Sequence, residues 1–171
     1  IDLFGVGTRL VTGKPDAALD GVYKLAYSNG KGRLKLSETL DKINLPGKKQ
    51  VYRIIQKDNT FYGAEAVTLA TEQAVDQMYH PTDANKHLDI KKFEQQPLLH
   101  MVMENGKRLT EPKSLGEIAR FTQHQLTRLP TEYKRFKNPH LYKIGVSKQL
   151  KTERDRLVEQ FQKSYEPSHM Q

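Results

Sequence analysis

The first eight residues, Ile1 to Thr8, constrain the chain most, because an apolar run there ends abruptly in the sequence Gly-x-Gly-Thr. Apolar residues that end in glycine are typical of a buried strand that runs into a tight turn. Glycine lets backbone N–H groups approach an anion closely, since no Cβ is in the way. The pattern predicts a phosphate-binding turn at the C-terminal end of a strand, where α/β barrels hold their ligands. An ordinary turn is the alternative that these residues alone leave open.

The composition limits what the chain can be. Its 171 residues suit one or two domains with a core, and no stretch approaches the roughly 18 apolar residues of a membrane span. The chain has no cysteine, which excludes disulfides, thiolate zinc sites and cysteine nucleophiles and fits a cytoplasmic protein. The apolar start carries Asp2 instead of the basic flank of a signal peptide, and we expect the chain to be a piece of a longer protein.

The charge balance is basic, with 28 Lys and Arg against 20 Asp and Glu and a net charge of +8. Such a balance fits a soluble basic surface, a nucleic-acid partner or a small polyanionic substrate such as a phosphorylated sugar. Neither an arginine-rich run nor an interleaved aromatic ladder favours nucleic acid.

Strand patterns fill the first two thirds of the chain. Alternation of apolar and polar residues predicts strands over residues 22–27 and 33–36. Residues 51–56 and 61–69 are also expected to be strands, and the apolar run 98–104 is expected to be a buried strand. The dipeptides Asn29-Gly30 and Asn105-Gly106 predict hairpin turns, because both residue types tolerate positive φ. Residues 71–77 are polar and show no clear pattern.

Helical patterns follow Pro112. Ser114 and Glu117 have the spacing of a capping box. The apolar stripe after it consists of Leu115, Ile118, Ala119, Thr122, Leu126 and Leu129. Ser147 is expected to cap a last helix with the stripe Leu150, Leu157, Val158, Phe161 and Tyr165. We expect an α+β chain: the final strand of an α/β barrel in residues 1–20, a mostly antiparallel β domain in residues 21–110 and a helical region in residues 111–171.

The residues show no catalytic constellation. The six histidines lack metal-ligand spacing, and the scattered carboxylates offer no acid and base pair, so neither catalytic nor metal-binding residues are assigned. Lys48 and Lys49 follow a Pro-Gly turn just before a strong strand. They could hold a phosphate or pyrophosphate as point charges, or they could only protect the edge of a sheet.

Several stretches, in the right order and over nearly the whole chain, resemble nicotinate phosphoribosyltransferases of the bacterial long form. They are IDLFGVGTRL (1–10), GVYKL (21–25), KLSE (35–38), PGKKQVYR (46–53), ENGKR (104–108) and EYKRFKNP (132–139). The first resembles the last barrel strand and phosphate loop of the family. The others resemble the strands that follow and the C-terminal domain. The chain resembles roughly the last third of such an enzyme.

The resemblance implies an activity for the intact enzyme. It would join nicotinate to phosphoribosyl pyrophosphate, giving nicotinate mononucleotide and pyrophosphate for NAD biosynthesis. ATP hydrolysis would be coupled through a phosphorylated histidine, with Mg²⁺ accompanying the phosphates. Family members are cytoplasmic homodimers with active sites near the dimer interface, and neither nucleic acid nor membrane is expected as a partner. The phosphorylated histidine belongs to the upstream part, so this chain alone is expected to be inactive.

The resemblance also implies binding residues. Gly5, Gly7 and Thr8 match the loop that holds the 5′-phosphate of the ribose, and Arg9 is a weaker candidate for the same role. Lys48 and Lys49 occupy the Pro-Gly-Lys turn, and our hypothesis is that they contact the pyrophosphate. The pyrophosphate could be the one bound by the same subunit or the one bound by the other subunit of the dimer. The alternative is a protein of a different functional class, a basic, non-enzymatic module for nucleic-acid binding or dimerisation.

Overall fold

A hairpin of two long strands is the centre of the fold in the computed structural model, which describes residues 3, 5, 7, 21–38, 42–83 and 85–165. Strand β3 (Lys49–Ile55) pairs antiparallel with β4 (Phe61–Leu69). Asn59, with φ of +66°, lies in the tight turn between them. The predicted strands over residues 51–56 and 61–69 are confirmed.

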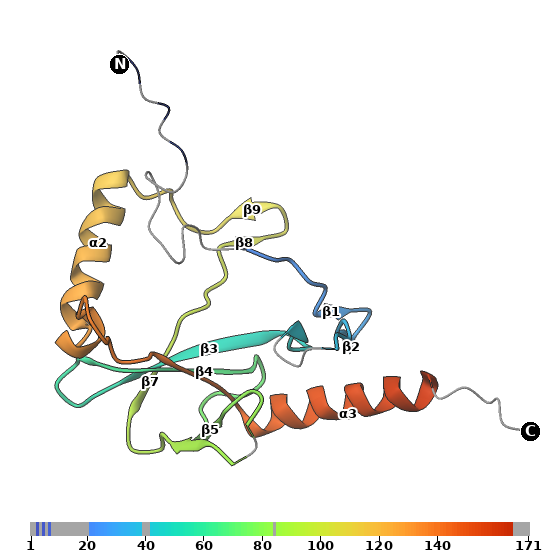
Figure 1. Cartoon of the computed structure of the whole chain (residues 1–171). Coiled ribbons are helices and arrows are strands. Elements are labelled where there is room, and N and C mark those ends of the chain that lie inside the picture. Colours follow the sequence, from blue (N-terminus) through green and yellow to red (C-terminus); the bar gives the residue numbers. More distant parts are fainter. Residues whose placement is uncertain are drawn as a thin grey trace, which may run out of the picture.

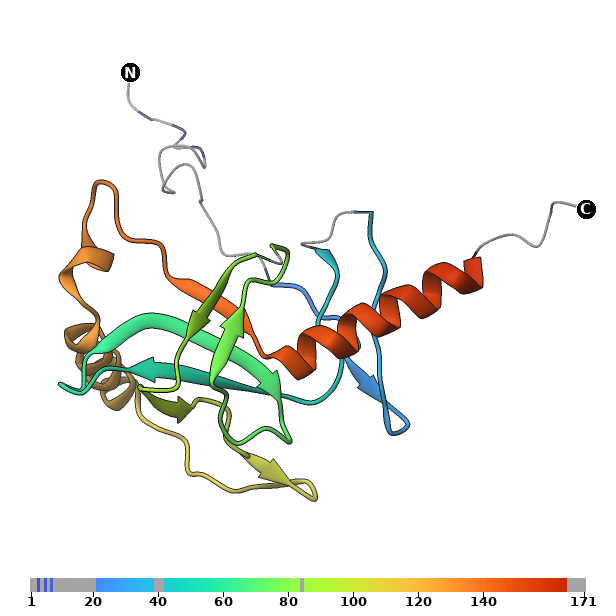
Figure 2. The same cartoon turned by 90° about the horizontal axis from the view of Figure 1, so that it is seen from below.

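Four shorter strands extend this hairpin into a six-stranded sheet that curls in Figure 2. They are β5 (Gln77–Tyr79), β6 (His87–Asp89), β7 (Glu94–Pro97) and β10 (Lys143–Val146). The strand order is β6-β5-β10-β4-β3-β7. Strand β10 runs parallel to β4, and the other neighbours in this sheet are antiparallel. The β-rich, mostly antiparallel character expected from the sequence is confirmed.

The core is a compact apolar cluster on one face of this sheet. Its buried members are Ile54, Ala64, Ala66, Met78 and Ile90. Strand β4 contributes through the alternation of buried and half-buried side chains along its length. Side chains on successive strand residues point to opposite faces, so one face of β4 supplies the core.

The last helix, α3 (Lys148–Tyr165), starts against this sheet and runs out beyond it (Figure 1). Its predicted cap is confirmed, because Ser147 Oγ accepts a hydrogen bond from the Leu150 amide at 3.1 Å. The same hydroxyl donates to a Glu72 carboxylate oxygen at 2.6 Å, which ties the start of the helix to the end of β4. Leu150 is fully buried and Leu157 is half-buried, as the apolar stripe predicts, but Phe161 of the same stripe is exposed.

Two small hairpins complete the strands of the described part. Strands β1 (Tyr27–Ser28) and β2 (Lys31–Gly32) form one, and β8 (Met103–Glu104) and β9 (Lys107–Arg108) form the other. Their Asn-Gly turns are confirmed, with φ of +50° and +73° in the first and +48° and +76° in the second. The longer strands predicted over residues 22–27 and 33–36 are wrong, because pairing is limited to two residues on each side of the turn.

Helix α2 (Leu115–Arg128) has the predicted capping box. The Glu117 amide donates to Ser114 Oγ at 3.3 Å, and the Ser114 amide donates to Glu117 Oε2 at 2.7 Å. None of its residues is buried, although the apolar stripe is typical of a helix that covers a core. Pro130 follows the helix and begins a short 3-10 turn, Thr131–Lys134.

The buried strand predicted over residues 98–104 is also wrong. Leu99, Met101 and Val102 are 52%, 65% and 57% exposed, and regular strand begins only at Met103. The segment leaves the sheet edge after β7 and has no second layer over it in the described part of the chain. The barrel strand stays a prediction, because only residues 3, 5 and 7 are described before residue 21. The domain division at residues 20 and 110 also stays a prediction.

Candidate functional site

The main candidate site is a cleft of about 680 Å³ where the β1–β2 hairpin, the Pro46-Gly47 turn, the end of β4 and the start of α3 meet. Residues with charged or hydroxyl side chains give it its chemistry: Tyr27, Lys48, Thr71, Lys148, Thr152 and Glu153. One of them, Lys48, is a residue that the sequence pointed to. We call this hollow the Lys48 cleft.

Lys48 lies on the wall of this cleft. Its ammonium nitrogen is 5.1 Å from the centre of the Tyr27 ring, within the range of a cation–π contact. Such a contact positions the ammonium but leaves its positive charge uncompensated. Lys48 is therefore placed to attract an anionic group that enters the cleft.

Lys49 has a different environment. Its ammonium donates to the carbonyl oxygens of Leu45 at 2.8 Å and Gly47 at 2.7 Å, and burial lowers the pKa of Lys49 below its usual value. It thus ties the turn that precedes β3 together. The two adjacent lysines are not brought to one point, and pyrophosphate contact by either of them stays a prediction.

Gly47 shapes the turn that presents Lys48. Its φ is +83°, in the region that favours glycine, and a Cβ built there would lie 2.9 Å from Leu69 Cδ2. The Gly47 amide donates to the Ala26 carbonyl at 2.7 Å, which binds the turn to the β1–β2 hairpin. The close approach that forms the cleft therefore depends on the absence of a side chain at this position.

The remaining charges of the cleft come from α3. Lys148 adds a second cation, and Glu153 adds a carboxylate. Both Glu153 oxygens accept from Arg156 at 2.8 Å, and these hydrogen bonds lower the pKa of Glu153. Because Arg156 compensates that carboxylate, the two lysines leave the cleft with a positive character that suits phosphate oxygens. Sequence reasoning missed Lys148, for which the only signal was the predicted cap at Ser147.

The predicted phosphate loop is only partly described. Gly5 and Gly7 are exposed, and a Cβ built on either would meet no atom within 4 Å. Thr8 and Arg9 lie outside the described residues, so the assignment of this loop to a ribose phosphate stays a prediction. In the described ranges no group of three or more His, Asp or Glu side chains could hold a metal ion, and no helix there is long and apolar enough to cross a membrane.

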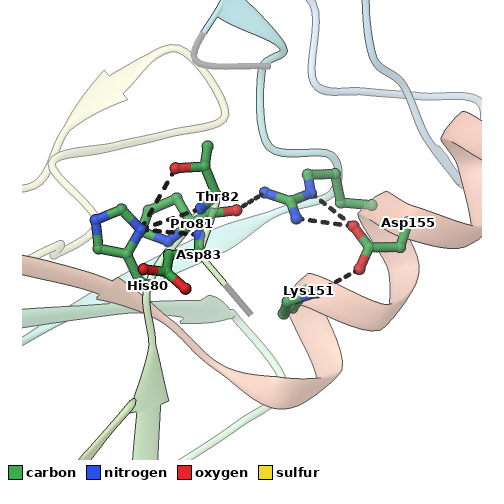
Figure 3. Close-up of polar contacts among 7 residues, drawn as sticks. His80, Pro81, Thr82, Asp83, Lys151 and Asp155 are labelled. Atoms are coloured by element: carbon green, nitrogen blue, oxygen red, sulfur yellow. Dashed lines mark hydrogen bonds and ion pairs between the residues drawn. The ribbon is translucent and has the colours of Figure 1, made fainter. Parts of the chain in front are cut away.

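A second polar cluster lies between the loop after β5 and the middle of α3 (Figure 3). His80 Nδ1 accepts hydrogen bonds from the amides of Thr82 at 3.3 Å and Asp83 at 3.1 Å. Arg154 donates to the Pro81 carbonyl and to Asp155 Oδ1. These groups use their hydrogen bonds on one another, so the cluster joins the loop to the helix. Pro81, Thr82, Arg154 and Asp155 also line a hollow of about 260 Å³.

Comparison with known proteins places the chain in a family. The family model of the nicotinate phosphoribosyltransferase C-terminal domain matches residues 48–154, a stretch that contains Lys48 and most of the cleft. The nicotinate phosphoribosyltransferase of Bacillus subtilis is 32% identical over 155 residues, which are 86% of this chain and 32% of the relative. That of Homo sapiens is 32% identical over 155 residues, which are 88% of this chain and 28% of the relative.

The fold agrees with these sequence matches. The crystal structure of human nicotinic acid phosphoribosyltransferase matches with a TM-score of 0.66 and 27% identity, over 82% of this chain and 27% of that chain. This chain thus spans only about a third of the length of the relatives that it matches. The matches do not favour the alternative of a nucleic-acid-binding module. The chain belongs to the nicotinate phosphoribosyltransferase C-terminal domain family.

Proposed function

We propose that this chain is the C-terminal part of an enzyme that joins nicotinate to phosphoribosyl pyrophosphate. The products are nicotinate mononucleotide and pyrophosphate, and the step introduces nicotinate into NAD biosynthesis. The observation that carries the proposal is the family match over residues 48–154, more than half of the chain. The positive character of the Lys48 cleft supports it, because both phosphate-bearing substrate and released product are polyanions.

In this proposal the chain contributes phosphate binding. Gly5, Gly7, Thr8 and Arg9 receive the 5′-phosphate through backbone amides, a hydroxyl and a guanidinium. Lys48 faces the pyrophosphate, whose charge grows as it leaves, and a fixed cation stabilises that developing charge. Lys49 supports it indirectly by bonding the carbonyls of the preceding turn.

Other parts of the proposal depend on the family resemblance. ATP supplies the energy of the coupled reaction when it is hydrolysed, and Mg²⁺ accompanies the phosphates. The described residues do not form a carboxylate or histidine cluster that fits Mg²⁺, so none of them is assigned to the metal. The phosphorylated histidine is assigned to the upstream part, and the active enzyme is a cytoplasmic homodimer. The chain alone is then expected to have no turnover.

A chimera tests the proposal. The 155 matched residues of the Bacillus subtilis relative are replaced by the corresponding part of this chain, and mononucleotide formation is measured. Lys48→Ala is expected to raise the KM for phosphoribosyl pyrophosphate about tenfold, the effect of losing one charge-assisted contact. Lys57→Ala, at an exposed turn lysine, is the matched control and should change nothing.

Three outcomes would contradict parts of the proposal. Unchanged kinetics of the Lys48→Ala chimera would remove the cleft from pyrophosphate binding. A folded chimera without any mononucleotide formation would count against the function of the chain. Turnover by the isolated chain would show that the catalytic residues lie within it.

A further inference from the structure

An apolar stripe on α2 has no partner within the described part of the chain. Leu115, Ile118 and Leu126 are 85%, 47% and 50% exposed, and Ala119 and Thr122 between them are exposed as well. The helix is nevertheless well formed, with a complete capping box at Ser114. Large contiguous apolar patches on folded proteins are typical of interaction surfaces.

The C-terminal end of α2 is held on the sheet through Gln125 and Arg128. The Arg128 guanidinium lies 4.5 Å from the centre of the Phe61 ring and donates to Asn59 O at 2.9 Å and Asn59 Oδ1 at 2.6 Å. Arg53 lies 4.6 Å from the same ring and donates to Gln125 Oε1 at 3.3 Å. At 3.6 residues per turn, Arg128 lies about 140° around the helix from Leu115, whereas Gln125 lies only about 20° from Ile118. The orientation of α2 is thus fixed while its stripe is left open.

A second apolar segment lies on the same side of the sheet. After β7 the chain is held by Gln50, whose side chain accepts from the Leu99 amide at 2.9 Å and donates to the Leu99 carbonyl at 3.0 Å. It then leaves the sheet and exposes Met101, Met103 and Leu109, which are 65%, 59% and 50% exposed. In Figure 1 the β8–β9 hairpin and α2 both rise on this side. We define the docking face as Met101, Met103, Leu109, Leu115, Ile118 and Leu126.

The charges around the docking face decide which partner fits it. Between residues 104 and 137 the chain has eight Lys and Arg but only four Glu and no Asp, a net charge of +4. A second copy of this chain on the same face would bring two positive rims together, and like charges across an interface cost several kcal/mol. The face therefore suits an apolar surface with an acidic rim.

We propose that the docking face packs against the phosphoribosyl-transferring part of the enzyme, the portion that the relatives have beyond the matched length. That portion is about two thirds of the relatives, which provides a partner large enough to cover the face. The inference rests on the proposed function, because it assumes that the chain is the C-terminal part of a transferase. It adds a specific interface: α2 and the β8–β9 hairpin join the two parts.

Single cysteines test the interface, since the chain has none of its own. Ile118→Cys reports the stripe, and His124→Cys, on the opposite side of the same helix, is the matched control. Met78→Cys, at a position 4% exposed in the core, reports whether the sheet is folded. Each is made in the isolated chain and in the chimera with the Bacillus subtilis relative, free of other cysteines, and its rate of reaction with a maleimide is measured.

The proposal expects Ile118→Cys to react fast in the isolated chain and at least about tenfold more slowly in the chimera. His124→Cys should react at similar rates in both. Equal rates of Ile118→Cys and His124→Cys in a chimera with a protected Met78→Cys would overturn the proposal. Protection of Ile118→Cys that grows with the concentration of the isolated chain would overturn it in favour of a second copy.

A second measurement covers a chimera that does not fold. The isolated chain is mixed with the Bacillus subtilis enzyme that lacks the matched residues, and binding is followed by sedimentation. Leu115→Asp should weaken binding at least about tenfold, whereas His124→Asp should not. Binding that is lost equally in both variants, or absent in the unsubstituted chain, would refute the interface. Because neither test measures turnover, an inactive chimera with a protected Ile118→Cys would contradict the proposed function alone.

Discussion

Gly63 in β4 provides the sharpest test of the packing between the sheet and the segment after α2. Its φ is +80°, and a Cβ built on it would overlap the ring of Tyr133. Gly63→Ala would require both a strained backbone and a displaced ring. Tyr133 would then lose its hydrogen bond to the Tyr62 carbonyl, at 3.2 Å, and its edge contacts with His140 and Tyr142, at ring distances of 5.7 and 5.8 Å.

The magnitude follows from these losses. Left-handed backbone at a residue other than glycine costs about 1–2 kcal/mol. The hydrogen bond contributes about 1 kcal/mol, and each aromatic pair contributes about 0.5–1.5 kcal/mol. Gly63→Ala is therefore expected to lower the free energy of unfolding by about 4 kcal/mol, which corresponds to a fall in Tm of roughly 10 °C for a chain of this size. Thermal and urea unfolding followed by circular dichroism measure it.

Gly30 is the matched control, because its φ is +73° and a Cβ there would meet no atom within 4 Å. Gly30→Ala should cost only the backbone strain, about 1–2 kcal/mol. Tyr133→Ala in the Gly63→Ala background should remove the overlap, so the double variant should lose less stability than the sum of the two single variants. Equal losses for Gly63→Ala and Gly30→Ala, or strict additivity in the double variant, would refute the reasoning.

Three further predictions concern protonation and phosphate binding. Hydrogen bonds from Ser114 lower the pKa of Glu117 in the folded protein. The stability that this carboxylate provides is therefore full above its unfolded pKa near 4.5 and is lost as the pH falls through the lower folded value. Glu117→Gln should make the stability of α2 depend less on pH in this acidic range. Burial, followed by the charge of Glu65, raises the pKa of Tyr142 to about 12, so stability should fall between pH 10 and 12, and Tyr142→Phe should remove that phase from an alkaline titration of stability. Thr8→Ala in the chimera should raise the KM for phosphoribosyl pyrophosphate more than the KM for nicotinate, and equal changes would contradict the assignment of the loop.

Local chemistry explains what could be predicted. The β3–β4 hairpin was predictable because its alternation and turn lie within a few residues of each other. The turns at Asn29 and Asn105 and the caps at Ser114 and Ser147 depend on one residue and its immediate neighbours. At these positions, interactions among residues a few places apart in the sequence are enough to determine the local structure.

Partners far away in the sequence explain what could not be predicted. Strand β7 has the polar sequence EQQP and becomes a strand because β3 offers a free edge. The apolar run at residues 98–104 and the stripe of α2 show which side chains favour burial, but not whether a covering surface exists in this chain. The same holds for the site: the Pro-Gly turn pointed to Lys48, whereas Lys148 reaches the cleft from 100 residues away.

The position of β10 has a consequence for the synthesis of the protein. Strand β10 is the link between β4 on one side and β5 on the other, and it comes more than 60 residues after either of them. A nascent chain can form the β4–β3–β7 ribbon and the β5–β6 ribbon early, but the two cannot be joined until residues 143–146 have left the ribosome. A polypeptide that stops short of Lys143 would hold two half-sheets with open inner edges, a state prone to aggregation.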